Sequence, residues 1–195
     1  MAYFPLFVSL DSLPCLVIGG GKVALRKVKT LLEYGAQITV VAPEIHPEIE
    51  EIAGLTFIRR KFEEKDLEGI RLVFAASSDE ACNAEAARLC RERKILINVA
   101  DVAEECDFFY PALVKRGDVV VGISTGGKSP AVASAIRKKI EGVLPENLGA
   151  FTEKAGRVRK EIKDKGISTE GNEEYLKLIN DYFDENQGEA DKRCQ

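Results

Sequence analysis

The first hundred residues alternate short, continuously apolar runs with longer segments of helical periodicity. Residues 22–35 and 79–94 are long enough for full helices, and residues 44–54 indicate a short, broken one. The apolar runs occupy residues 15–19, 37–42, 55–60, 71–77 and 95–100. Strands that are apolar throughout are buried on both faces of a sheet, and strands connected through helices run parallel. The pattern therefore predicts an α/β fold with a doubly wound parallel sheet.

After this segment the pattern changes. Residues 107–125 indicate two strands joined by a turn, and Ser129 and Pro130 are placed to cap and begin the next helix. Two amphipathic helices follow, and the charge-rich residues 184–195 are predicted to form a frayed tail. We therefore expect three regions: a sheet domain over 1–110, a small region over 111–145, and a helical C-terminal region over 146–195.

Composition narrows the class of protein. A net charge of −4 over 195 residues gives no electrostatic reason to expect a nucleic-acid partner. The five cysteines are an odd number without CxxC spacing, so neither a disulfide framework nor a metal site is expected. The sequence has no basic leader and no apolar window of about 20 residues, the length that a membrane helix needs. We expect a cytoplasmic protein without a membrane partner.

A glycine-rich loop joins the first predicted strand to the first helix. Gly19, Gly21 and Ala24 match the spacing G-x-G-x-x-G/A. The first glycine permits a tight turn, and the second lets the backbone approach a pyrophosphate at the start of the helix. The loop predicts a Rossmann-like dinucleotide-binding unit. The alternative is a glycine turn that only packs.

The acidic residue that usually follows the second strand of such a unit is absent. Residues 39–42 offer no carboxylate, and Glu44 lies beyond Pro43. We expect Glu44, or the backbone at Pro43, to meet the adenosine. The first helix carries a basic row, which consists of Lys22, Arg26 and Lys29. This row is either a solvated face or helps to bind a 2′-phosphate or an anionic substrate. The sequence therefore leaves open whether the cofactor is NAD or NADP.

Among the titratable residues, Asp101 is the candidate for acid–base chemistry. It ends the fifth predicted strand, where ligands bind in open α/β sheets. A carboxylate there can accept a proton as hydride leaves for a nicotinamide, although it can equally cap a turn. No Tyr-x-x-x-Lys motif occurs, and His46 between prolines is predicted to be a surface residue. Nearby acids are predicted to form a solvated loop: Glu104, Glu105 and Asp107.

A second glycine loop, "STGGKSP", lies between a strand and a helix. Backbone donors at this helix start, together with Lys128, would form an anion site. The alternative is a loop built only for a sharp turn and a helix cap. The candidate substrate-binding residues are Ser124, Thr125, Gly126, Gly127, Lys128 and Ser129.

Four segments occur together in this chain, residues 4–44, 74–83, 97–114 and 122–141, and their combination resembles the siroheme synthase N-terminal family. The resemblance extends to about residue 165. It implies NAD⁺-dependent oxidation of precorrin-2 to sirohydrochlorin, and in some members insertion of Fe²⁺ or Co²⁺. It also implies a homodimer whose dimerisation region here is 111–145.

The resemblance further implies roles for individual residues. Asp101, in "NVAD", would be the catalytic residue, and the loop 124–130 would face a tetrapyrrole rich in carboxylates. The implied dinucleotide contacts are Gly21, Lys22, Val23, Pro43, Glu44, Ala76 and Ser77. Iron insertion stays open. So do two other interpretations: a regulatory module that binds NAD without turnover, and an interaction protein that binds no nucleotide.

Overall fold

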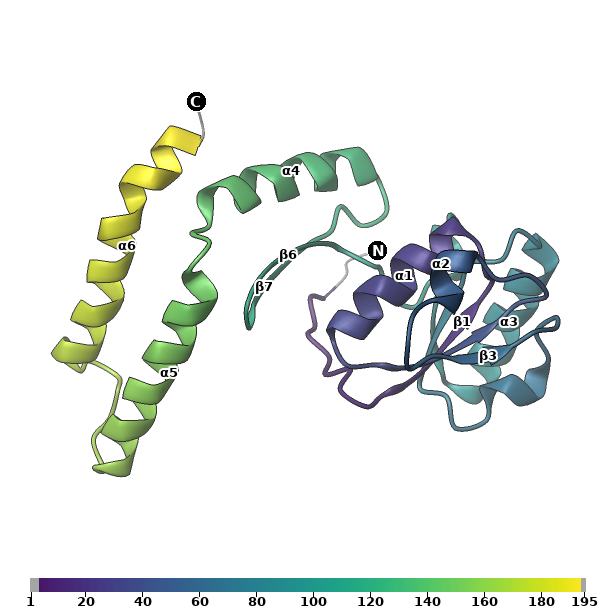
Figure 1. The fold of residues 1–195 in the computed structure, drawn as a ribbon, viewed down its shortest axis with the longest axis horizontal. Helices are drawn as coiled ribbons and strands as arrows, with labels where there is room; N and C mark the ends of the chain where they lie inside the picture. The colour runs from purple at the N-terminus through teal and green to yellow at the C-terminus, as the bar shows by residue number, and fades with distance from the viewer. Residues whose placement is uncertain (1–3, 194–195) are drawn as a thin grey trace. The chain divides into compact units, whose positions relative to one another are not determined.

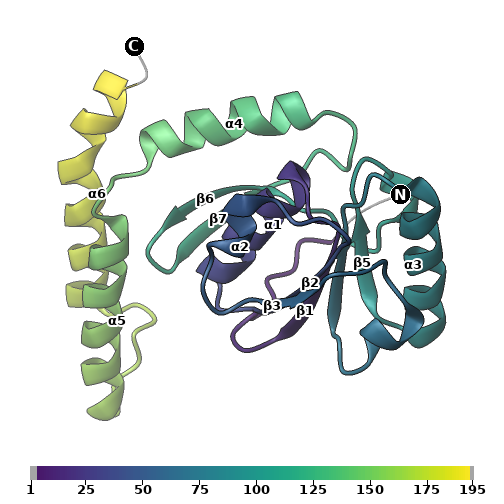
Figure 2. The same ribbon diagram turned by 45° about the vertical axis from the view of Figure 1, so that its right-hand side comes forward.

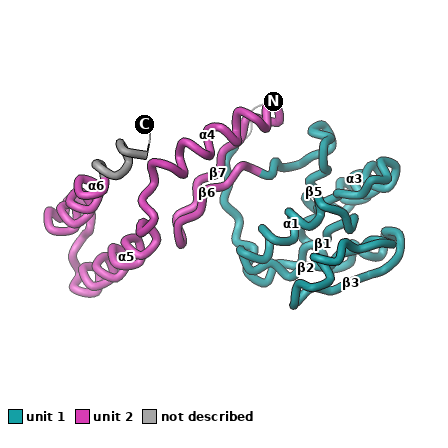
Figure 3. The backbone as a smooth tube through the Cα atoms, turned by 45° about the horizontal axis from the view of Figure 1, so that its top comes forward, with its two compact units in different colours: residues 1–110 teal, residues 111–195 magenta. Residues whose placement is uncertain are grey.

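The computed structural model describes residues 4–193, with side-chain detail to residue 186. The chain forms two compact units, Met1–Tyr110 and Pro111–Gln195 (Figure 3). Within the described residues, no helix combines the length and the apolar content that crossing a membrane requires.

The first unit is built on a five-stranded parallel sheet with the strand order β3-β2-β1-β4-β5, of which β1 and β3 are labelled in Figure 1. The strands are β1 (Pro14–Ile18), β2 (Gln37–Val41), β3 (Thr56–Ile58), β4 (Leu72–Ala75) and β5 (Leu96–Val99). The helices are α1 (Lys22–Glu33), α2 (Pro47–Glu50) and α3 (Glu80–Arg93), with 3₁₀ turns at Glu64–Leu67 and Ala103–Glu105. The order reverses between β1 and β4, as in a doubly wound sheet.

Each face of this sheet carries its own buried core, because successive strand residues point to opposite sides. Cys15 and Val17 of β1 pack with the apolar side chains of α1 and with Ile49 of α2. Leu16 and Ile18 pack on the other face, with α3 and the first 3₁₀ turn. Figure 2 shows α1 and α2 on one side of the sheet and α3 on the other. The predicted α/β class is confirmed.

Helix α1 ends where the sequence predicts. Gly35 adopts φ +77°, a left-handed conformation that favours glycine, and its N–H donates to the carbonyl of Leu32 at 3.0 Å. Ala36 N–H donates to Leu31 O at 3.2 Å, which satisfies a second terminal carbonyl. The chain then turns directly into β2.

The second unit contains the antiparallel hairpin β6 (Ala112–Arg116) and β7 (Val119–Ile123), and helices α4 (Pro130–Val143), α5 (Leu148–Asp164) and α6 (Glu173–Arg193). Helix α4 packs on the hairpin, and α6 packs on α4 and α5. Phe151 and Tyr182 stack with ring centroids 3.7 Å apart, and the Tyr182 hydroxyl donates to Asn147 at 2.7 Å. This contact joins α5 to α6.

Helix α6 continues to Arg193, so the prediction of a frayed tail from residue 184 is wrong over the described part. Most residues of this segment are charged or polar, and the long side chains of Glu, Gln, Lys and Arg are compatible with a helix. Cys194 and Gln195, the end of the predicted tail, lie outside the described residues.

Candidate functional site

One edge of the parallel sheet gathers most of the residues singled out in the sequence. In the sheet register, Ile18 lies between Val41 and Ala75, and Ala75 lies beside Val99. Because parallel strands end at the same edge, the segments that follow them lie next to one another there: residues 19–21, 42–44, 76–77 and 100–101. The edge includes the point where the strand order reverses, which is the usual ligand site of such sheets.

The three consecutive glycines of the loop differ in what an added Cβ would contact. Gly19 has φ +111°, and a Cβ there would overlap the carbonyl oxygen of Ala76. A Cβ at Gly20 would overlap the carbonyl oxygen of Glu44. At Gly21, in contrast, a Cβ would meet no described atom within 4 Å. The first two glycines are required by the fold itself, whereas the third leaves an open space beside the start of α1.

That space has the character of an anion site. Gly21 is the N-cap of α1, and it has no side chain with which to cap the first N–H groups of the helix. The N-terminus of a 12-residue helix adds a partial positive charge. Lys22 is exposed beside it, and Val23 is half-buried. These residues fit the pyrophosphate of a dinucleotide.

The segment after β2 closes one side of this loop. His46 N–H donates to Gly20 O at 2.8 Å, and the His46 ring accepts from Glu48 N–H at 3.3 Å as the N-cap of α2. Half-buried His46 is thus a structural cap, while Pro43 and Glu44 are exposed beside the glycine loop.

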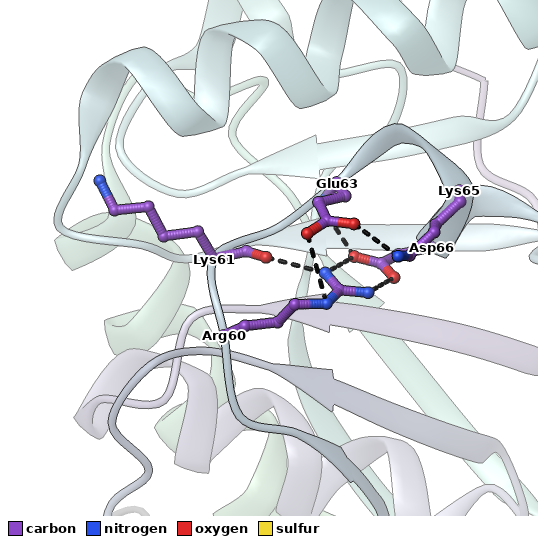
Figure 4. A network of polar contacts seen from close by, with 5 residues as sticks. All are labelled: Arg60, Lys61, Glu63, Lys65 and Asp66. Atoms are coloured by element: carbon purple, nitrogen blue, oxygen red, sulfur yellow. Dashed lines mark hydrogen bonds and ion pairs between the residues drawn. The ribbon is translucent and has the colours of Figure 1, made fainter.

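A network of charged side chains follows β3, the neighbour of β2 (Figure 4). Arg60 donates two hydrogen bonds to Asp66, at 2.8 and 2.6 Å, and lies 3.5 Å from Glu63. Burial alone would raise the pKa of Asp66, but the hydrogen bonds from Arg60 and from the Glu63 backbone outweigh it and hold the pKa below its usual value. The Lys61 side chain points away from this cluster. The guanidinium of Arg60 is therefore committed to Asp66.

The loop after β4 is fixed by buried Asn83. The Asn83 amide accepts from Ser77 N–H at 3.2 Å and donates to Ser77 O at 2.9 Å. Ala76 N–H donates to Ile18 O at 2.7 Å, which extends the pairing of β4 with β1. Ala76 and Ser77 are thereby held beside Gly19.

Asp101 lies at the far end of the same edge, two residues after β5. Its backbone has φ +63°, a left-handed conformation that Asp tolerates better than most residues. Ala100 N–H donates to Ala75 O at 2.8 Å, which anchors the turn, and the Asp101 side chain is exposed. An exposed carboxylate at this edge can accept a proton from a bound molecule.

The structure adds a buried charge that the sequence analysis did not identify. Lys27 of α1 is only 9% exposed, and its ammonium donates to Asn98 Oδ1 at 2.7 Å. It lies 4.8 Å from the ring centre of Tyr110 and 5.3 Å from that of Phe74. Burial lowers its pKa from 10.5 to about 8, against a smaller opposing effect of Cys106.

Two signals in the sequence point to this pair. Lys27 lies three residues after Ala24 and four before Leu31, inside the apolar stripe of the helix, and Asn98 interrupts an apolar strand. The row Lys22, Arg26 and Lys29 is exposed, as a solvated face requires.

The acidic loop after Asp101 is exposed at Glu104 and Asp107, as expected, but Asp107 also has a structural role that the sequence did not indicate. Its carboxylate accepts from Ile97 N–H at 3.0 Å, and its own N–H donates to Ile97 O at 2.9 Å. The adjacent thiol of Cys106 accepts from Val99 N–H at 3.2 Å. Strand β5 is the last of the sheet, and the loop supplies partners for its outer groups.

The "STGGKSP" loop belongs to the second unit. Thr125 Oγ1 accepts from Ser129 N–H at 3.1 Å and donates to Ser129 O at 3.0 Å, and Ser129 Oγ caps α4 by accepting from Val132 N–H. Ser124 Oγ accepts from Gly126 N–H at 3.1 Å. These hydroxyls serve the turn and the cap, and exposed Lys128 supplies the positive charge of the loop.

Four cysteines in the described chain are free thiols: Cys15, Cys82, Cys90 and Cys106. Over the same residues, no group of three or more His, Cys, Asp or Glu side chains is arranged to hold a metal ion.

Comparison with known proteins agrees with this geometry. Residues 6–112 match an NAD(P)-binding family, and residues 116–142 match the central family of sirohaem biosynthesis proteins. The solved structure of SirC, a precorrin-2 dehydrogenase, superposes with a TM-score of 0.77 at 27% identity, covering 99% of this chain and 98% of that chain.

Curated relatives are longer than this chain. The siroheme synthase of Methylococcus capsulatus is 43% identical over 166 residues, which are 84% of this chain and 35% of that protein. The siroheme synthase of Tolumonas auensis is 40% identical over 166 residues, 85% of this chain and 36% of that protein. The chain thus spans about a third of the length of these relatives. The chain belongs to this NAD(P)-binding family and is related to siroheme synthases over about a third of their length.

Proposed function

We propose that this chain oxidises precorrin-2 to sirohydrochlorin with NAD⁺, using Asp101 as the general base. The observation that carries the proposal is the position of Asp101. Its exposed carboxylate lies on the sheet edge that also carries Gly21 and the uncapped start of α1. The likeness to a protein named precorrin-2 dehydrogenase over nearly the full length of both chains supports the choice of substrate.

Some residues of this sheet edge bind the cofactor, and Asp101 accepts the proton. The N–H groups at the start of α1 hold the pyrophosphate next to Gly21, where open space lets the backbone approach. Gly19 and Ala76 keep the loop against the sheet. The bound nicotinamide supplies the hydride acceptor. Asp101 takes the proton that the substrate loses with the hydride, so two electrons leave as hydride and one proton passes to the carboxylate.

The adenosine side of the edge favours NAD over NADP. Exposed Glu44 after β2 suits ribose hydroxyls and repels a 2′-phosphate. Arg60, a basic residue after the neighbouring strand β3, is committed to Asp66 through two hydrogen bonds and so does not offset the charge of Glu44. We therefore propose NAD⁺ as the cofactor.

The second unit contributes to the proposal through Lys128 and through assembly. The exposed ammonium of Lys128 suits the carboxylates of a tetrapyrrole. The region 111–145 would form the contact of a homodimer, and analytical ultracentrifugation measures whether the protein is a dimer. Four free thiols fit a reducing, cytoplasmic location.

The test is an anaerobic assay of the full chain with precorrin-2 and either NAD⁺ or NADP⁺, followed by the absorbance of reduced nicotinamide. We expect stoichiometric reduction of NAD⁺ and much slower reduction of NADP⁺. Binding of NAD⁺ without reduction would instead support a regulatory module, and absence of nucleotide binding would support an interaction protein. Addition of Fe²⁺ or Co²⁺ to the product then shows whether the chain also inserts metal.

A further inference from the structure

We propose that Lys27 is a positioning residue for Asp101, acting through Asn98 and the thiol of Cys106. The inference rests on the proposed function, because it concerns the reaction in which Asp101 takes part. Lys27 contacts neither cofactor nor substrate in this account. It holds the turn that presents the carboxylate.

The first step is the contact between helix and strand. The Lys27 ammonium donates to Asn98 Oδ1 at 2.7 Å, and both residues are buried, at 9% and 5% exposure. A hydrogen bond from a charged donor is stronger than one between neutral groups. It fixes the orientation of the Asn98 amide, because Oδ1 must face the ammonium and Nδ2 must face the other way.

The second step runs from Asn98 to the loop beyond Asp101. Asn98 Nδ2 donates to Phe108 O at 3.0 Å and lies 3.5 Å from Cys106 Sγ. The oriented amide therefore holds the returning segment against β5. Without Lys27, Oδ1 would lose its charged partner, and only the contacts of Nδ2 would hold the amide in this orientation.

The third step connects Cys106 to the turn itself. The thiol accepts from Val99 N–H at 3.2 Å, and it lies within donating distance of two carbonyls, Val99 O at 3.1 Å and Val102 O at 3.3 Å. These contacts join the residue before the turn to the residue after it. Asp101 lies between them with φ +63°. A less common backbone conformation persists only where its surroundings fix it.

The environment of Lys27 argues against a purely stabilising role. Burial lowers the pKa of this lysine to about 8, so the fold holds a charge at neutral pH at a cost. The charged and titratable groups around it are Arg26 on its own helix, Asp101 and Cys106 on the loop, and the Tyr110 ring. An apolar side chain of similar length would fill the same space without that cost.

The experiment compares the full chain with Lys27→Met and with Lys154→Met, an exposed lysine in the middle of α5 that serves as the matched control. Two quantities are measured. One is backbone hydrogen exchange over residues 97–108, and the other is the steady-state kinetics of precorrin-2 oxidation. We expect Lys27→Met to accelerate exchange over 97–108, with no change over the glycine loop at 19–24. We expect kcat to fall about 10- to 100-fold while KM for NAD⁺ stays within about twofold.

The two measurements separate this proposal from the proposed function. Unchanged exchange over 97–108 overturns the positioning role whatever the chemistry. Faster exchange with parental kcat also overturns it, because the turn would then not matter to the reaction. A parental chain that reduces no NAD⁺ contradicts the proposed function, and the exchange data still decide whether Lys27 holds the turn.

A double variant covers the case in which the single variant does not fold. Lys27→Met combined with Asn98→Leu removes the ammonium and its acceptor together, so the Asn98 oxygen is not left buried without a partner. We expect this protein to fold and still to show the reduced kcat. A folded double variant with parental kcat overturns the proposal.

Discussion

A carboxylate added at Gly21 should impair the phosphate site without impairing the fold. Gly21 has φ −87°, which any residue adopts, and a Cβ there meets no described atom within 4 Å. Asp is also a favourable N-cap residue, so Gly21→Asp should leave the free energy of unfolding unchanged or slightly increased. The affinity for NAD⁺ should fall at least about 100-fold, because like charges in contact cost several kcal/mol.

Calorimetric titration of NAD⁺ measures that affinity, and Gly21→Ala is the uncharged control at the same site. The alanine variant should bind more tightly than the aspartate variant. Parental affinity in Gly21→Asp would remove the glycine loop from the cofactor site.

Lys27 makes a prediction about stability and pH. Its pKa is about 8 in the folded chain and 10.5 when unperturbed, so the unfolded chain binds more protons between these values. Burial of the charged lysine therefore lowers the free energy of unfolding at pH 8 and below, and this penalty disappears as the pH rises to 10.5. The difference corresponds to about 3 kcal/mol.

Denaturant unfolding of the parental protein and Lys27→Met across this range measures the contribution of Lys27 together with its effect on Cys106, whose pKa the lysine charge lowers. The stability of the parental protein relative to the variant should increase with pH. Parallel stability curves would mean that the folded pKa of Lys27 is not lowered.

At the scale of elements, the hairpin β6–β7 and helix α5 meet through two glycines. A Cβ at Gly149 would lie 2.9 Å from the carbonyl oxygen of Arg116 and from the Cα of Gly117, closer than side chains approach backbone. Gly149→Ala should therefore lower the free energy of unfolding by about 1–3 kcal/mol.

Gly156, on the same helix, is the matched control, because no described atom lies within 4 Å of a Cβ there. Gly156→Ala should raise the free energy of unfolding by up to about 1 kcal/mol, since alanine favours helix over glycine. Equal effects of the two substitutions in urea unfolding would show that the hairpin does not contact α5 in solution.

The elements themselves could largely be predicted from the sequence. Strands such as β1 are apolar throughout, and Ser129 and Pro130 mark the start of α4 in both sequence and structure. The end of α6 could not be predicted in this way, because a charged and polar segment suits both a helix and a frayed tail. The hydrogen bond between Asp107 and β5 also could not be predicted, since it depends on a loop that folds back onto the strand.

At the scale of the whole molecule, the strand order determines which residues meet at one edge of the sheet. The crossover between β1 and β4 brings the glycine loop, Ala76 and Asp101 to one edge, and the alternation of strands and helices predicts such an edge. The contact of Lys27 with Asn98 joins residues 71 positions apart. No periodicity in the sequence encodes such a pair, although a lysine inside an apolar stripe marks its place.

The central claim is that Asp101 takes a proton while hydride leaves for NAD⁺. Asp101→Asn keeps the size of the side chain and the tolerance for φ +63°, and it removes only the basic carboxylate. The most direct measurement is a single-turnover reaction of precorrin-2 with NAD⁺, in which reduced nicotinamide is followed for the parental protein and Asp101→Asn. The account predicts that the variant binds NAD⁺ with parental affinity and reduces it about 100-fold or more slowly. Reduction at the parental rate would contradict it.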